Sequence, residues 1–248
     1  MEIFERVKTL LFNPKEEWTI IEAENAPQQK VLVGYLLILA LIPAVAIFFN
    51  YWWTWHSAYT DAINQMSGYN DNMDYILESI KEQMPFKAKF GLIAAAEQLL
   101  LIIGGTYIAA AVINALSNQF GAEKNFDRAF ALVAYSFTPM CVAGVLYIFN
   151  PLVWLVPYLG LYGVLLLYHG ATPLLKPAED KKTACFVIAL IIVIGTWMLL
   201  EKAVIPEVKK QIYIAEAKAA FKKAHDGQNA DYKEIEKQIE RELRKKKY

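Results

Sequence analysis

The sequence predicts an all-α integral membrane protein with five transmembrane helices, N-terminal amphipathic helices and a charged helical C-terminal tail. Of the 248 residues, 56% are hydrophobic, which exceeds the roughly 45–50% that is typical of soluble domains. The apolar residues gather in blocks of about 20, the length at which a helix crosses the core of a bilayer. Charged residues concentrate between these blocks and at both ends of the chain. Together these observations favour a multi-pass membrane protein.

Residues 1–30 precede the first apolar block and are expected to form two amphipathic helices. In residues 1–12 the apolar side chains repeat at helical spacing and form one stripe. The stripe consists of Ile3, Phe4, Val7, Leu10 and Leu11. A second helix should run from about Pro14 to Glu24, because proline suits the first helical position. Two interpretations stay open: the helices lie on the bilayer surface, or they pack on the protein's own cytoplasmic loops.

Five apolar blocks are expected to form the membrane domain, residues 31–205. The predicted spans are residues 31–49, 90–116, 129–149, 151–169 and 184–205. Each is close to the length of about 20 residues that a membrane-spanning helix needs. Only Asn150 lies between the third block and the fourth, which opens with Pro151, and this predicts a tight helical hairpin.

Two polar segments lie outside the apolar blocks. Residues 50–87 open with the aromatic cluster NYWWTWHSAY and then become polar and acidic. We expect one or two interfacial helices there, outside the bilayer. Residues 206–248 are highly charged and carry a thin apolar stripe at helical spacing. We expect a solvated helical extension, with a coiled-coil partner as the alternative.

The distribution of lysine and arginine favours a cytoplasmic N-terminus. These residues are slightly more frequent on the segments that this orientation places inside, residues 1–30, 117–128 and 170–183. An odd number of spans then places the tail on the far side. The basic character of the tail itself argues the other way.

A carboxylate, Glu97, lies near the middle of the second predicted span. It follows Lys89 by about 12 Å along a helix, which places it near the middle of the membrane. A charge there is costly, and the apolar runs of the predicted spans, the fifth taken as residues 184–200, contain no lysine or arginine that could pair with it. We therefore expect a largely protonated side chain that faces other helices beside Gly104 and Ala111, with Gln98 bordering this face. It belongs either to a proton, ion or lipid pathway or to an interhelical hydrogen bond.

Three further residues complete the candidate intramembrane polar site. Tyr135 and Ser136 precede Pro139, and we expect them to shape a kink. The Ser136 hydroxyl should bond a backbone carbonyl that the proline leaves free. His169 ends the fourth block, where an interfacial histidine at a helix end is the default interpretation and pH sensing is the alternative.

Several classes of function find no support in the sequence. The formal net charge is zero, so no basic character points to nucleic acid. Cys141 and Cys185 lie in apolar runs and should be small buried side chains, and no cluster has the spacing of metal ligands. No nucleophile–base motif or phosphate-binding glycine loop is present. We expect no metal, no cofactor and no enzymatic activity.

The expected partners are the lipid bilayer and proteins that bind the N-terminal helices or the tail. We expect no nucleic-acid partner, and the sequence sets no oligomeric state. These expectations rest on the amphipathic helices before the first span and on the charged residues after the last one.

Three stretches resemble one family of multi-pass membrane proteins. They are LLFNPKEEWTIIEAE before the first span, FDRAFALVAYSFTPM entering the third, and LYHGATPLLKPAEDKKTACFVIAL between the fourth and fifth. Together they resemble the bacterial branch of the Yip domain family, whose eukaryotic relatives interact with Ypt/Rab GTPases. The most specific piece is the aromatic-Ser-x-x-Pro pattern of Tyr135, Ser136 and Pro139. The bacterial N-terminal pattern is matched by Asn13, Pro14 and Trp18.

The resemblance covers residues 5 to 205. It implies five membrane helices in the bacterial cytoplasmic membrane, with a cytosolic N-terminus and the C-terminus on the far side. The Asp-Leu-Tyr-Gly-Pro segment of the eukaryotic relatives is absent here, so Rab binding is not carried over. The first hypothesis is a non-enzymatic membrane scaffold or organiser. The alternative is a small transporter, channel or lipid-moving protein with Glu97 in its pathway.

Overall fold

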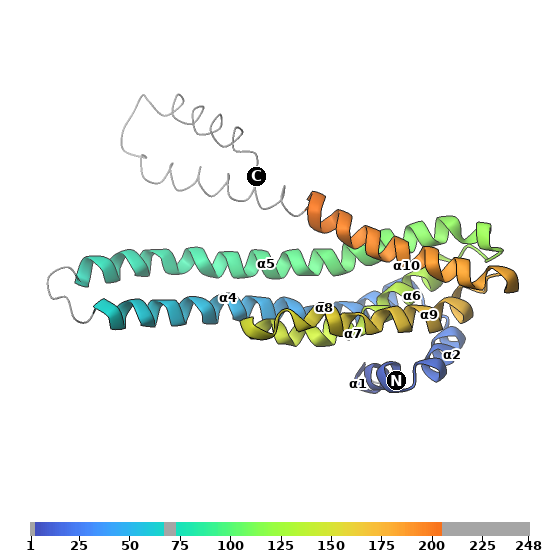
Figure 1. Ribbon diagram of the computed structural model, residues 1–248, viewed down its shortest axis with the longest axis horizontal. Coiled ribbons are helices and arrows are strands. Elements are labelled where there is room, and N and C mark those ends of the chain that lie inside the picture. Colours follow the sequence, from blue (N-terminus) through green and yellow to red (C-terminus); the bar gives the residue numbers. More distant parts are fainter. Residues whose placement is uncertain (1–2, 67–72, 205–248) are drawn as a thin grey trace, which may run out of the picture. The chain divides into compact units, whose positions relative to one another are not determined.

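The computed structural model describes residues 3–66 and 73–204, and the described elements are all helices (Figure 1). The α-helices are α1 (Ile3–Phe12), α2 (Pro14–Glu24), α3 (Gln28–Val31), α4 (Leu37–Met66), α5 (Met73–Leu116), α6 (Phe126–Ser136), α7 (Thr138–Ala143), α8 (Leu155–Gly160), α9 (Tyr162–Leu175) and α10 (Lys182–Leu199). Short 3-10 or π-helical segments cover Leu32–Leu36, Ser117–Phe120, Gly144–Ile148, Asn150–Leu152, Glu179–Lys181 and Leu200–Val204. The all-α class and the two N-terminal helices are confirmed.

The chain divides into two compact units, Met1–Trp197 and Met198–Tyr248. Every contact discussed below lies within the first unit. The predicted helical tail, residues 206–248, lies outside the described residues.

Within the described residues, five helical stretches are long and apolar enough to cross a membrane. They are Gln28–Tyr51, Gly91–Phe120, Phe126–Ile148, Leu155–Leu175 and Glu179–Lys202, numbered below as the first to fifth spans. This confirms the predicted number of spans. Most ends lie a few residues away from the predicted ones, because the helical backbone does not stop where the apolar run does.

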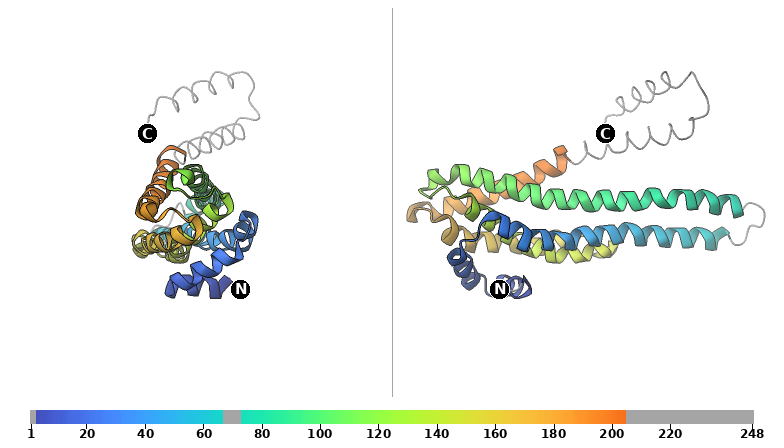
Figure 2. Two further views of the ribbon diagram at one scale, coloured as in Figure 1. Left: turned by 90° about the vertical axis from the view of Figure 1, so that its right-hand side faces the viewer. Right: turned by 180° about the vertical axis from the view of Figure 1, so that it is seen from behind.

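The polar loop predicted after the first span differs from expectation. α4 continues to Met66 and α5 begins at Met73, so most of residues 50–87 extends two membrane helices instead of forming separate interfacial ones. Residues 44–66 contain no glycine or proline. Adding a residue to an existing helix costs far less than nucleating a new helix, so α4 propagates through the polar sequence. Figures 1 and 2 show α4 and α5 side by side.

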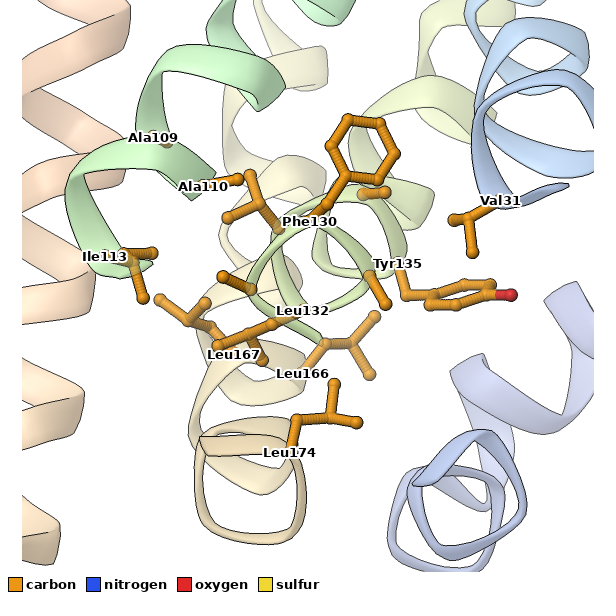
Figure 3. Close-up of a cluster of buried hydrophobic side chains, with 14 of the residues drawn as sticks. Val31, Ala109, Ala110, Ile113, Phe130, Leu132, Tyr135, Leu166, Leu167 and Leu174 are labelled. Carbon is orange, nitrogen blue, oxygen red and sulfur yellow. The ribbon is translucent and has the colours of Figure 1, made fainter. Parts of the chain in front are cut away.

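The third span is the centre of the helical bundle. In its most apolar stretch 72% of the residues are buried, against 17–44% in the other four spans. Figure 3 shows side chains of α6, including Phe130 and Leu132, gathered with Ile113 of α5 and Leu166 of α9. The family-like stretch AYSFTP therefore lies where several helices meet.

The helix of the third span is interrupted at Phe137, between α6 and α7. Pro139 has no N–H to donate to the carbonyl of Tyr135, four residues earlier. The hydroxyl of Thr138 donates to that carbonyl instead, with an Oγ1–O distance of 2.6 Å. The prediction that gave this role to Ser136 is wrong, because the Ser136 hydroxyl is buried and makes no hydrogen bond in the described structure.

The buried face of α5 is rotated relative to the predicted one. Its buried positions include Gln98, Ile102, Thr106, Ala109, Ala110 and Ile113. Glu97 is half-buried and Ala111 is exposed. A Cβ built at Gly104 would meet no atom within 4 Å. The expected close helix contact at positions 104 and 111 is therefore wrong.

Candidate functional site

The two N-terminal helices pack against the membrane domain. Figures 1 and 2 show α1 and α2 close to the bundle, where α2 contacts α9 and α1 contacts α7. Leu10, Trp18 and Ile21 face the bundle and are at most 4% exposed. Tyr162 of α9 donates a hydrogen bond to the carbonyl of Leu11, with an Oη–O distance of 2.7 Å. The structure therefore favours packing of the N-terminal helices on the protein over a position on the bilayer surface. They pack on the membrane helices and not on the loops that were expected.

Gly170 of α9 makes room for Trp18. A Cβ at this position would lie 2.6 Å from Cζ2 of Trp18 and 2.7 Å from Cδ1 of Leu132. Both separations are far shorter than the contacts that close-packed side chains make. Glycine is therefore required here for the tryptophan to sit between α2 and the bundle.

A buried group of charges holds α1 to α2. Arg6 of α1 is 6% exposed and Glu17 of α2 is fully buried. Nε of Arg6 lies 3.5 Å from Oε1 of Glu17, and Nη2 of Arg6 donates to Oε1 of Glu24. The single guanidinium of Arg6 thus pairs with two carboxylates. The three side chains together carry a net negative charge when both acids are ionised.

Tyr135 of α6 joins these charges to the central span. Nη1 of Arg6 donates to the Tyr135 hydroxyl over 3.4 Å, and the guanidinium carbon lies 5.5 Å from the ring centre, within reach of a cation–π contact. The same ring lies 4.5 Å from the ring of Tyr35 and 6.1 Å from that of Trp18, centre to centre. We call Arg6, Glu17, Glu24 and Tyr135 the docking cluster.

Glu17 is the least satisfied member of the docking cluster. Neither of its carboxylate oxygens accepts a hydrogen bond in the described structure, and the indole N–H of Trp18 is also unpaired there. Burial raises the pKa of Glu17, and the charge of Arg6 opposes this rise only in part. Glu17 is therefore easier to protonate in the docked helices than it would be in water.

Docking of the N-terminal helices should weaken as the pH rises. A pKa that is raised in the docked state means that docking takes up a proton. Its contribution to stability is full below the ordinary pKa of 4.5 and is lost as the pH rises through the raised value. Glu17→Gln should remove this dependence of docking stability on pH. Hydrogen exchange of residues 3–24, measured at each pH in the wild-type protein and in the variant, reports the stability of docking. If the two proteins lose protection equally as the pH rises, the prediction is wrong.

A chain of hydroxyl groups ties the first span to the interruption in the third. Tyr35 and Thr138 lie 2.7 Å apart, oxygen to oxygen. Because Thr138 donates to the carbonyl of Tyr135, Tyr35 is the donor to Thr138. All three residues are at most 5% exposed. Their contacts fix the backbone that carries the Tyr135 ring toward Arg6.

Thr138→Val should destabilise the bundle by about 1–3 kcal/mol, because the Tyr35 hydroxyl and the Tyr135 carbonyl both lose a buried partner. Thr19→Val is the matched control. Thr19 donates to the carbonyl of Lys15 on an exposed surface, where water can replace the bond. Thermal unfolding of both variants in one detergent compares them, and equal midpoints would show that the Thr138 bond contributes nothing.

The candidate polar residues lie in different environments. Tyr135 belongs to the docking cluster, whereas Ser136 lines a pocket with residues of α8, α9 and α10. Glu97 is half-buried and Gln98 is buried on α5, and His169 is half-buried on α9. Functional roles for Glu97, Gln98 and His169 stay predictions.

Three members of the docking cluster were not predicted from the sequence. Arg6 stands between Ile3 and Leu10 on the apolar stripe of α1, and Glu17 directly precedes Trp18 on α2. A basic residue on one buried face and an acidic residue on the next are the signal of an ion pair between the helices. This signal depends on both faces being buried, which the local pattern does not establish.

Metal binding has no candidate in the described part of the chain. Residues 3–66 and 73–204 contain no group of three His, Cys, Asp or Glu side chains that could hold an ion. Cys141 and Cys185 are buried free thiols, as predicted.

The fold and the docking cluster define an integral membrane protein whose five apolar helices carry two further N-terminal helices attached to the central span. A model of the Yip1 domain matches residues 8–200, well over half of the chain, so the protein belongs to the Yip1 domain family. The match includes Glu17, Glu24 and Tyr135, and it begins two residues after Arg6. No curated protein and no solved structure matches the chain.

Proposed function

We propose that the protein is a non-enzymatic membrane scaffold that presents its N-terminal helices at a fixed position on the membrane domain. The docking cluster carries this proposal, because Arg6 contacts both an acid of α2 and the central span. Burying an ion pair is costly, and apolar residues of similar size often stabilise as well or better. A buried ion pair between α1 and α2 that also contacts the central span therefore supports a role in fixing the position of the helices.

The docked helices leave a surface that suits protein partners. Phe4 and Phe12 are 74% and 77% exposed, and Lys8 stands between them on the same side of α1. Aromatic residues are enriched where proteins bind one another. We propose this side of α1 as the main partner surface and the tail, residues 206–248, as a second one.

The proposed orientation places the N-terminal helices in the cytoplasm and the tail on the far side of the cytoplasmic membrane. The slight excess of lysine and arginine on the corresponding loops and the odd number of spans support it. Reporter fusions at the two ends test this orientation. A cytoplasmic signal from the tail would contradict it.

A photo-crosslinking amino acid in place of Lys8 tests the scaffold role in cells. We expect discrete protein adducts of constant mass, which disappear when Arg6→Ala releases the helices. The same amino acid at Ile191, 62% exposed on α10, reports contacts made by the membrane domain. If Lys8 gives no discrete adduct, and Glu97→Gln abolishes a proton, ion or lipid flux in vesicles, the transporter alternative replaces the scaffold.

A further inference from the structure

A cavity of about 220 Å³ lies between the third, fourth and fifth spans. Its walls come from α6, α7, α8, α9 and α10. Val133 and Leu167 form its buried part, with exposures of 0% and 2%, whereas Leu161 and Ile194 at its rim are 62% and 49% exposed. The cavity therefore leads from the interior of the bundle to the outer surface of the membrane helices.

Two glycines of the fourth span shape this space. A Cβ at Gly163 would lie 2.5 Å from the carbonyl oxygen of Ser136, so the third and fourth spans approach closely at that point. A Cβ at Gly160 would make an ordinary contact of 3.5 Å with Met140. The missing side chain of Gly160 therefore leaves volume open. The fifth span closes the cavity with few contacts of its own, since only 17% of its apolar stretch is buried.

The chemistry of the cavity excludes water and favours hydrocarbon. Among the described residues that line it, only Ser136 and Trp197 have polar side-chain groups. Water in an apolar cavity lacks the two to four polar partners that it needs. An empty cavity leaves its walls without dispersion contacts on one side. A flexible apolar chain supplies those contacts and needs no hydrogen bonds.

We propose that this cavity binds one acyl chain of a bilayer phospholipid. All lining residues belong to the third, fourth and fifth spans, so the medium at the rim formed by Leu161 and Ile194 is the hydrocarbon of the membrane. The bound chain fills the space beside Gly160 and supports α10 against the bundle. This site is separate from the docking cluster and does not depend on the scaffold role.

A photoactivatable phospholipid tests the site. The full-length protein is reconstituted in phosphatidylcholine vesicles that contain a phospholipid with a diazirine near the end of one acyl chain. Irradiation should label Val133 and Leu167, which bulk lipid does not reach because both are buried. Ile191 on the exposed side of α10 measures ordinary contact with the bilayer. Labelling of Ile191 without labelling of Val133 or Leu167 would overturn the proposal.

Gly160→Leu should reduce the labelling of Val133 and Leu167, relative to Ile191, by about tenfold or more, because the new side chain occupies the space of the lipid chain. Gly195→Leu is the matched control, since a Cβ at Gly195 meets no atom within 4 Å. Undiminished labelling in folded Gly160→Leu protein would overturn the proposal.

Ile194→Trp provides a second variant that does not alter the packing of α8. Its larger side chain obstructs the rim from α10, where half of the native side chain is already exposed. We expect the same loss of labelling at Val133 and Leu167. If Gly160→Leu does not fold, unchanged labelling in Ile194→Trp contradicts the proposal by itself.

Discussion

Replacing Arg6 by alanine should detach the N-terminal helices from the membrane domain. The variant leaves the fully buried Glu17 without its ion pair and removes the hydrogen bonds to Glu24 and Tyr135. Removing one partner of a buried pair costs about 3–5 kcal/mol. Because 1.4 kcal/mol corresponds to a factor of about ten, hydrogen-exchange protection of residues 3–24 should fall by about 100-fold or more.

Two controls separate loss of the ion pair from loss of charge in general. Lys8→Ala removes an exposed charge from the same helix, where the pair with Glu5 is open to solvent, and should leave protection unchanged. Arg6→Met combined with Glu17→Leu replaces both buried ions by apolar side chains and should restore much of the protection. Full protection in Arg6→Ala alone would show that the docking cluster does not hold the helices.

The effect of Arg6→Ala should also depend on pH. The charge of Arg6 is the main influence that lowers the pKa of Glu17, and without it burial and the charge of Glu24 raise that pKa further. A protonated Glu17 is neutral and tolerates burial. The loss of protection should therefore be smallest below the ordinary pKa of 4.5 and should grow as the pH rises.

The number of spans follows from the sequence because the requirement that produces it is local. Each span needs a run of about 20 apolar residues, and such a run is visible without knowledge of its neighbours. The first N-terminal helix is predictable for the same reason, since its apolar stripe repeats over consecutive turns. The second is predictable from Pro14, which suits the first helical position. The lengths of α4 and α5 are less predictable, because a helix that has begun in the membrane continues into polar sequence.

The orientation of α5 and the docking cluster depend on partners that are distant in sequence. Apolar side chains surround much of α5, so the local pattern does not separate the face at Gln98 from the face at Glu97. Arg6 and Tyr135 are 129 positions apart, and their contact exists only after α1, α2 and α6 have packed together. The local sequence pattern alone therefore fixes neither the buried face of α5 nor the partners of Arg6.

The structure gives separate tasks to the residues of the AYSFTP stretch. Pro139 interrupts the helix, Thr138 bonds the carbonyl that the proline leaves free, and Tyr135 receives Arg6. Ser136 contributes to the cavity wall. The stretch that carries the most specific part of the resemblance is therefore also the place where the N-terminal helices meet the central span.

Trp18→Ala should weaken docking by about 3–5 kcal/mol, comparable to the loss of Arg6, because a large and fully packed side chain is removed. Trp18 is 1% exposed, meets the ring of Tyr135 edge-on and fills the space over Gly170. Its removal leaves a cavity between α2 and α9. Hydrogen exchange of residues 3–24 measures the loss of protection.

Trp154→Ala is the matched control, because Trp154 is 62% exposed and fills no buried space. Gly170→Leu changes the same contact from the α9 side. It should weaken docking, because the leucine side chain would overlap the space that Trp18 occupies. In the double variant the leucine at position 170 can occupy the space left by Trp18. The loss of docking stability in the double variant should therefore be smaller than the sum of the losses in the two single variants. Strict additivity would mean that Trp18 and Gly170 do not share one packing site, and the role assigned to this glycine would then be wrong.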